Sequence, residues 1–235
     1  ALDPMSLACM CLRHRELHST GQRRDWAKND NDFQNDKDIP MNSNSTKEKC
    51  SDCRAVVSTY DGVYLSTGDT NRFLCSKCYN KSVSEAMGLN FDHLSFHPII
   101  LADRDGSDHT FHFQTRLFGD KVSIQALEIK EGVPKGYEFS VHSDAEDDLF
   151  GLFAKLVDRI RYELERKHIE PGDLNRYSIT NEDIVRGRIT WDDDTGGEVP
   201  CLVIDGKELS WREFGRMLMT YEGFHFKLEI FEGSE

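Results

Sequence analysis

The sequence predicts an α+β protein in which a small zinc-binding module precedes an antiparallel sheet packed by one long and one short helix. Three patterns indicate this fold: two Cys-x-x-Cys pairs, a series of alternating strand-like segments, and two helical segments that each follow a capping box. A chain of 235 residues can hold a small domain and a mid-sized one with a real apolar core. We therefore expect an N-terminal segment and polar linker at 1–46, a four-Cys zinc-binding module at 47–90 and an acidic α+β domain at 91–235.

The N-terminal segment is expected to contribute little to a core. From 29 to 46 the residues are mostly Asn, Asp, Ser and Thr, which is typical of a linker. The part before it contains four residues of metal-binding types: Cys9, Cys11, His14 and His18. Their spacing is not that of an ordinary zinc finger, and no hairpin separates the two halves. A loosely docked amphipathic segment is our expectation, and a second metal site remains the alternative.

The zinc site is predicted at two cysteine pairs separated by 21 residues: Cys50, Cys53, Cys75 and Cys78. A Cys-x-x-Cys turn brings two sulfurs to one ion, and two such turns supply the four thiolates of a closed tetrahedral site. A pair of disulfides or four unrelated buried thiols are the alternatives, although a Cys-x-x-Cys disulfide closes a very small loop and stabilises little. We expect one structural zinc at about 2.3 Å from each sulfur, with no position open to water.

The residues between and after the pairs predict the scaffold of this module. The β-prone runs 56–60 and 63–65 flank Asp61-Gly62, which is a hairpin turn signal. Residues 79–87 are expected to form a short helix that ends at Gly88. A knuckle, a hairpin and a second knuckle that opens a helix resemble a treble-clef zinc finger, a resemblance that specifies a scaffold and not a task.

The domain after residue 90 is predicted from strand and helix patterns. Strands are expected at 99–102, 109–113, 122–129 and 137–141, and the turn residues between them favour an antiparallel meander. A capping box from Ser143 to Glu146 predicts a helix at about 145–168, whose apolar stripe must cover the sheet. A second capping box from Ser210 to Glu213 predicts a helix to about 220. Further strands are expected at 186–191, 201–204 and 224–231.

The charge of the chain limits the classes of partner. The formal net charge is −13, and the excess of acidic residues lies after residue 90. Such a surface repels phosphate groups and lipid headgroups, so nucleic acid is an unlikely partner and a membrane is not expected. The sequence has no apolar run of transmembrane length, and the stretch before residue 12 is too short for a signal peptide. We expect a cytoplasmic protein, since a reducing compartment suits thiolates that serve zinc.

Two classes of function follow from these residues. The preferred class is a non-enzymatic protein-binding or adaptor protein, with another protein as its partner and with zinc as a structural staple. The alternatives are a hydrolase or transferase with an acid–base cleft near His97 and Asp103, and nucleic-acid binding through the zinc module. His109 and His112 are expected to point to opposite faces of a strand, so they do not form a metal site. No phosphate loop, dinucleotide fingerprint, nucleophile elbow or HExxH helix occurs in the sequence.

Three further stretches carry a resemblance to a known group of proteins. They are the run from Cys50 through the second knuckle to the FHPIILAD segment at 96–103, the RLFGD segment at 116–120 and the EFGRMLMTYEG segment at 213–223. Together they resemble uncharacterised bacterial proteins catalogued as domains of unknown function, over about residues 48–232. The resemblance implies an N-terminal four-Cys finger and a C-terminal acidic α+β domain. It implies no activity, no catalytic residues and no oligomeric state.

Overall fold

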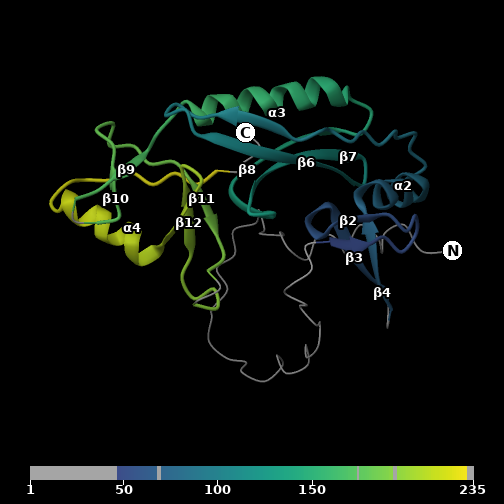
Figure 1. The fold of residues 1–235 in the computed structure, drawn as a ribbon, viewed down its shortest axis with the longest axis horizontal. Helices are drawn as coiled ribbons and strands as arrows, with labels where there is room; N and C mark the ends of the chain where they lie inside the picture. Colours follow the sequence, from purple (N-terminus) through teal and green to yellow (C-terminus); the bar gives the residue numbers. More distant parts are fainter. Residues whose placement is uncertain (1–46, 68–69, 174, 193–194, 232–235) are drawn as a thin grey trace, which may run out of the picture. The chain divides into compact units, whose positions relative to one another are not determined.

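The computed structural model describes residues 47–231 with gaps at 68–69, 174 and 193–194. Within these ranges the protein combines mostly antiparallel sheets with three helices (Figure 1). The chain divides into two compact units, Ala1–Tyr79 and Asn80–Glu235. The predicted linker and the residues Cys9, Cys11, His14 and His18 lie outside the described residues. None of the described helices is long and apolar enough to cross a membrane.

The first unit is built from two short antiparallel pairs and the start of a helix. Its elements are β1 (Lys47–Lys49), β2 (Val56–Ser58), the 3-10 helix η2 (Thr59–Asp61), β3 (Gly62–Thr67), β4 (Thr70–Cys75) and α2 (Ser76–Met87). Strand β1 pairs with β2, and β3 pairs with β4 so that Thr67 lies opposite Thr70. Helix α2 ends before Gly88, whose φ of 66° matches the predicted glycine stop.

The predicted hairpin turn at Asp61-Gly62 is wrong. Asp61 ends η2, and Gly62 is the first residue of β3, where it pairs with Cys75. Glycine is needed there for close approach, because a Cβ on Gly62 would lie 2.1 Å from the Phe73 ring. The hairpin instead reverses between Thr67 and Thr70.

The second unit contains the rest of α2 and then a four-stranded antiparallel meander, as predicted. Strands β5 (Ile99–Ala102), β6 (Asp108–Phe118), β7 (Lys121–Lys130) and β8 (Val133–Asp144) follow one another in the order β5-β6-β7-β8. The last three strands are longer than predicted because pairing continues to the hairpin ends, where Phe118 lies opposite Lys121. Residues 134–136 belong to β8, with a register shift between Leu127 and Ile129 that accommodates two extra residues of β8.

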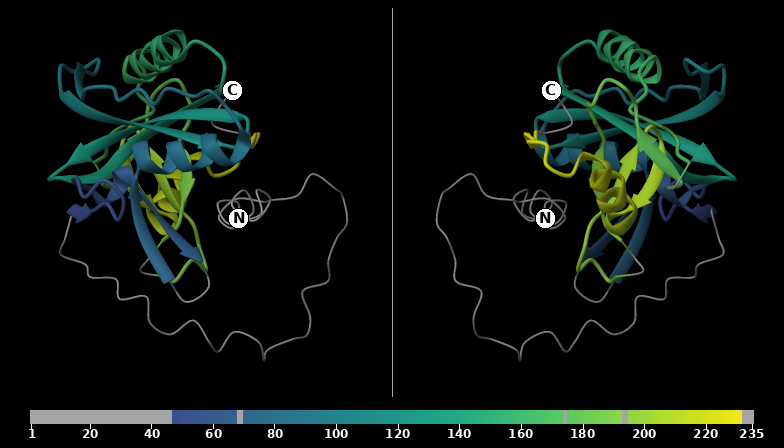
Figure 2. Two further views of the ribbon diagram at one scale, coloured as in Figure 1. Left: turned by 90° about the vertical axis from the view of Figure 1, so that its right-hand side faces the viewer. Right: turned by 90° about the vertical axis from the view of Figure 1, so that its left-hand side faces the viewer.

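Helix α3 (Leu149–Leu164) covers one face of this sheet (Figures 1 and 2). Its apolar stripe is buried, as predicted: Leu149, Leu152, Leu156, Ile160 and Leu164. The predicted start at residue 145 is wrong, since Ser143 and Asp144 still pair with β7 and are therefore extended. Asp148 caps the helix instead, and its carboxylate accepts hydrogen bonds from the backbone N–H groups of Phe150 and Gly151.

Smaller sheets and a second helix follow α3. The elements are β9 (Ile169–Pro171), β10 (Tyr177–Ile179), β11 (Arg188–Thr190), β12 (Cys201–Ile204), β13 (Lys207–Ser210), α4 (Trp211–Leu218) and η3 (Met219–Tyr221). Ser210 and Glu213 form the predicted capping box at α4. A small core of Ile169, Ile204, Leu209 and Met217 holds these elements together.

The predicted strand at 224–231 is wrong. These residues join no sheet among the described elements, and their apolar side chains are exposed. Alternation predicts a strand only where a neighbouring edge supplies hydrogen bonds, and no described edge does so here.

Asn80 on α2 completes the free edge of β6 within the second unit. Strand β5 pairs with β6 only up to Phe111, so Thr115 and Leu117 lie beyond it. The Asn80 side chain is fully buried; its Nδ2 donates to Thr115 O at 2.7 Å, and its Oδ1 accepts from Leu117 N at 3.0 Å. Nδ2 also lies 2.8 Å from His93 Nδ1. The Asn80 side chain therefore makes the hydrogen bonds that a neighbouring strand would otherwise make to this part of β6.

Replacing Asn80 by Asp is expected to destabilise the second unit. The carboxylate keeps the shape but cannot donate, and its oxygen would face Thr115 O, so we expect the free energy of unfolding to fall by about 2–4 kcal/mol. Urea unfolding followed by fluorescence measures this change. Asn90→Asp is the matched control because Asn90 is exposed. A urea midpoint that is unchanged by Asn80→Asp would show that the Asn80 amide does not stabilise the second unit.

Candidate metal centre

The first cysteine pair lies in the turn between β1 and β2. Cys50 N donates to Ala55 O at 2.9 Å, and Arg54 N donates to Cys50 O at 3.1 Å. Arg54 has a φ of 64°, which reverses the chain directly after Cys53. The turn therefore presents both sulfurs from one short segment, as the spacing predicts.

The second pair lies where β4 passes into α2. Cys75 is the last residue of β4 and Cys78 lies in the first turn of the helix. The backbone N–H of Cys75 donates to the Cys50 sulfur at 3.4 Å. Ser76 anchors this junction, since its hydroxyl donates to Asp61 O at 2.7 Å. The positive end of the helix dipole lies beside this pair and opposes the effect of burial on these thiols.

Folding brings together all four predicted ligands: Cys50, Cys53, Cys75 and Cys78. Their four sulfur atoms all lie within 4.8 Å of one another, and Cys53 Sγ lies 3.7 Å from Cys75 Sγ. Four sulfurs placed tetrahedrally at about 2.3 Å from one ion lie roughly 3.8 Å apart. The arrangement is therefore compatible with one bound metal ion.

The surroundings of these thiols shift their pKa values in different directions. Burial raises the pKa of Cys50, but hydrogen bonds from the backbone of Cys75, Cys53 and Asp52 outweigh it and lower the pKa to about 6. Burial, followed by hydrogen bonds among the neighbouring thiols, raises the pKa of Cys78. Burial likewise raises the pKa of Cys75. Four thiolates at this spacing need a cation to offset their charge.

The two alternatives to a metal site do not describe this cluster. None of the five described cysteines forms a disulfide, so the two pairs are not disulfide-bonded. Four unrelated thiols would not converge, whereas these come from two separated turns to one point. Cys201 lies apart on β12, where its thiol donates to Leu209 O at 3.2 Å.

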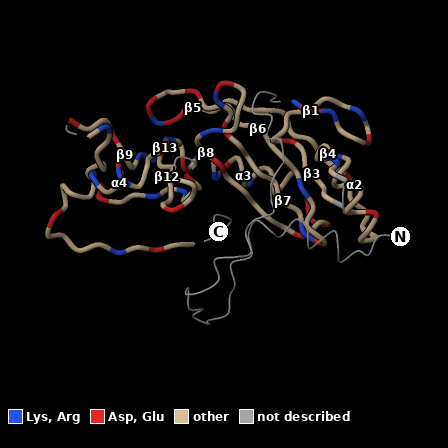
Figure 3. Tube along the Cα trace, turned by 90° about the horizontal axis from the view of Figure 1, so that it is seen from below, with Lys and Arg blue, Asp and Glu red and all other residues tan. Residues whose placement is uncertain are grey.

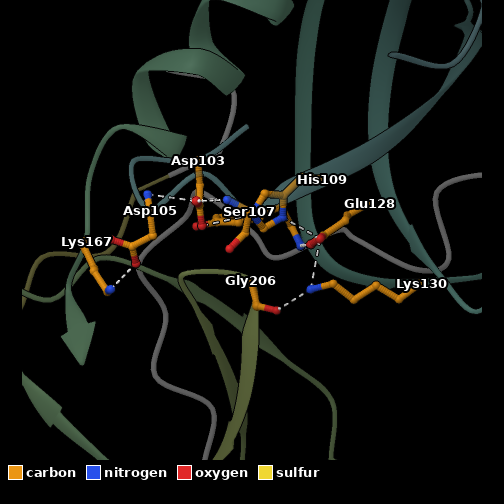
Figure 4. A network of polar contacts seen from close by, with 9 residues as sticks. Asp103, Asp105, Ser107, His109, Glu128, Lys130, Lys167 and Gly206 are labelled. Carbon is orange, nitrogen blue, oxygen red and sulfur yellow. Dashed lines mark hydrogen bonds and ion pairs between the residues drawn. The ribbon is translucent and has the colours of Figure 1, made fainter. Parts of the chain in front are cut away.

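Asp103, a predicted acid–base residue, belongs to a polar network in the second unit (Figure 4). Its Oδ1 accepts from the backbone N–H groups of Asp105 at 2.9 Å and Ser107 at 2.8 Å, as in an Asx turn. Its Oδ2 lies 3.3 Å from His109 Nε2. Asp103 therefore orders its own turn and pairs with His109, whereas His97 is exposed.

Glu128 on β7 is the centre of this network. Its side chain is 1% exposed; Oε1 lies 2.7 Å from His109 Nδ1 and 2.9 Å from Lys130 Nζ. Its Oε2 accepts from Tyr137 N at 2.9 Å. Lys130 Nζ also donates to Gly206 O at 3.2 Å (Figure 4). The network thus ties β6, β7 and β8 to the turn before β13.

The electrostatics of the network favour a charged pair. The hydrogen bond to Glu128 raises the pKa of His109. Burial raises the pKa of Glu128, but its contacts with His109, Tyr137 N and Lys130 outweigh burial and lower the pKa. Both groups are held by protein partners, which is the arrangement of a structural ion pair. The sequence analysis did not single out Glu128, although a glutamate followed two residues later by Lys130 in a mostly apolar strand was a signal.

His109 and His112 on β6 do not converge on one point. His109 contacts Asp103 and Glu128, while His112, three residues further along β6, lies on the opposite face. Among the described residues, the four cysteines form the one group of three or more metal-binding side chains that converge.

A surface hollow of about 500 Å³ lies beside α3. It is lined by Asp158, Arg159, Tyr162, Glu163, Arg166, Arg186 and Phe231. Neither His97 nor Asp103 borders it, so it does not supply the cleft expected for the enzyme alternative. Acidic and basic residues are interspersed along the described chain (Figure 3).

Three families match consecutive parts of the chain, and each is described as a domain of unknown function. DUF7685 matches residues 49–90, DUF7686 matches residues 92–165 and DUF7713 matches residues 168–235. The first match contains the four cysteines, the second contains the meander with α3, and the third contains α4. No curated protein and no solved structure matches the chain. The chain is therefore similar to three successive domains of unknown function, and the predicted resemblance is confirmed in that form.

Proposed function

We propose that Cys50, Cys53, Cys75 and Cys78 bind one zinc ion, and that this ion is a structural staple of a treble-clef-like module. The convergence of the four sulfurs within 4.8 Å carries the proposal. Thiolates are soft ligands and a tetrahedral set of four suits zinc. Four protein ligands leave no position for water or substrate, so the ion would stabilise the fold and would not act in catalysis.

Metal analysis tests this proposal directly. Protein purified without chelator should contain one zinc per chain, and extraction of the metal should expose the module to protease. Cobalt substitution should then give the absorption of a tetrahedral thiolate site. Protein that folds without stoichiometric metal, or that holds an iron–sulfur cluster instead, would contradict the proposal.

For the whole chain we propose a non-enzymatic protein-binding or adaptor role. The observation that supports it is the exposure of apolar side chains in the C-terminal part. Several large apolar residues there are at least half exposed: Ile189, Trp191, Met219, Phe224, Phe226, Leu228, Ile230 and Phe231. Surfaces that expose this much apolar area mark sites of protein association. The net charge of −13 disfavours a phosphate-rich partner.

A quantitative pull-down from the native host tests the binding role. The full chain with Leu228→Asp should lose the partner that the unchanged chain retains, because a carboxylate cannot enter an apolar interface. Ile100→Asp is the matched control, since Ile100 is 65% exposed on β5 and lies outside the C-terminal part. Equal recovery with both variants would contradict a binding role for the C-terminal residues.

A further inference from the structure

The C-terminal segment, residues 224–231, has the alternating sequence of a strand but joins no sheet among the described residues. Phe224 N donates to Tyr221 O at 3.0 Å, and the following residues up to Phe231 make no backbone hydrogen bond to any other described residue. Phe226 is 90% exposed, and Leu228 and Ile230 are 73% and 74% exposed. Phe231 borders the hollow beside α3 but still exposes 63% of its surface.

The two faces of the C-terminal segment differ in chemistry. Phe224, Phe226, Leu228 and Ile230 alternate along the chain, so they share one face of an extended backbone. The other face carries Lys227 and Glu229 between His225 and Phe231. Lys227 and Glu229 form an ion pair with each other, as side chains two residues apart do in an extended chain. The segment therefore combines an apolar face with a face that carries both signs of charge.

This pattern is complementary to itself when two copies run antiparallel. With Leu228 opposite Leu228, Phe226 lies opposite Ile230 on the apolar face, and this pairing occurs twice. On the other face Lys227 lies opposite Glu229, again twice. A shift of the register by two residues, which keeps the apolar faces together, would place Lys227 opposite Lys227. Opposite charges across a strand pair stabilise it and like charges destabilise it, so the charges select the first register.

We propose that the C-terminal segment of one chain pairs antiparallel with the same segment of a second copy, with Leu228 on the two-fold axis. This inference rests on the proposed binding role of the segment and names its partner. The pairing supplies backbone hydrogen bonds to groups that make none to described residues, and it makes a closed two-fold interface. A second copy is favoured over another protein because the chain itself carries the matching charges.

The expected dimer is weak and depends on concentration. An isolated two-stranded ribbon is marginally stable in water, so its apolar face needs further cover. Leu218 and Met219, 44% and 66% exposed, precede the segment and offer such cover. Each copy also carries a net charge of −13, so the two copies repel one another. Association should therefore be measured at physiological ionic strength or above, where this repulsion is screened.

Charge exchange in the full chain tests the register. Sedimentation velocity over a concentration series should show a reversible monomer–dimer equilibrium for the unchanged chain. Lys227→Glu turns both Lys–Glu pairs into Glu–Glu pairs, which should raise the dissociation constant at least about tenfold. The double variant Lys227→Glu with Glu229→Lys restores both pairs and should restore the dimer. Both side chains are largely exposed, so circular dichroism and zinc content should not change.

The outcomes separate this inference from the proposed binding role. A chain that stays monomeric at all concentrations, a dimer indifferent to Lys227→Glu, or a double variant that fails to recover would each overturn the self-pairing. Loss of a different protein from the Leu228→Asp pull-down, together with a monomeric chain, would overturn the second copy as partner and keep the binding role. A dimer restored by the charge exchange supports the inference.

Discussion

Replacing Cys75 by Ser is expected to abolish metal binding and to unfold the described part of the first unit, residues 47–79. The substitution removes one of four thiolates, and the core of the first unit is small, with Phe73, Leu74 and Tyr79 as its large buried side chains. Structural zinc contributes on the order of 10 kcal/mol in modules of this size, more than such a core supplies. The meander with α3 has its own core and should stay largely folded.

Metal analysis and limited proteolysis measure the two halves of this prediction. Zinc content should fall to background, and cleavage sites should appear between residues 47 and 79 while the second unit resists. Cys201→Ser is the matched control, since Cys201 lies outside the cluster and its thiol donates to a backbone carbonyl that a hydroxyl also reaches. A Cys75→Ser chain that keeps both its metal and its resistance would refute the zinc site.

Replacing Glu128 by Gln is expected to lower the stability of the second unit by about 3 kcal/mol near neutral pH. The amide keeps the shape of the carboxylate but removes the buried negative charge that His109 and Lys130 contact. Glu131→Gln is the matched control, because Glu131 is exposed in the turn after β7. Urea unfolding compares the two variants with the unchanged protein.

The pH dependence of stability provides a second readout for Glu128. Its lowered pKa means that its contribution is present above the ordinary pKa near 4.5 and is lost as pH falls through the lower folded value. The raised pKa of His109 means that its contribution is present below the ordinary value near 6.5 and is lost as pH rises through the higher folded value. Glu128→Gln should flatten the plot of unfolding free energy against pH at both its acidic and its near-neutral limb. A plot that keeps its shape would show that the Glu128–His109 pair does not govern the pH dependence of stability.

The sequence alone determined the features that depend on neighbouring residues. Two Cys-x-x-Cys turns present their sulfurs from short segments, so the four ligands could be named before any fold was known. Period-two alternation identified the meander, although pairing at the hairpin ends lengthened its strands. The capping box at Ser210 and Glu213 formed as predicted, because all its partners lie within one turn.

Only the tertiary structure decided features that depend on residues far apart in the chain. Ser143 carries a capping signal, but its pairing with Val122 on β7 keeps it extended, and Asp148 caps α3 instead. Gly62 resembles a turn residue, but glycine is required there because the ring of Phe73 leaves no space for a Cβ. Glu128 finds its partner in His109, 19 residues away on the neighbouring strand. Residues 224–231 alternate like a strand, yet they join no described sheet, because a strand needs a second edge to pair with. A sequence specifies the alternation of a strand, but it does not specify the neighbour that satisfies the hydrogen bonds of that strand.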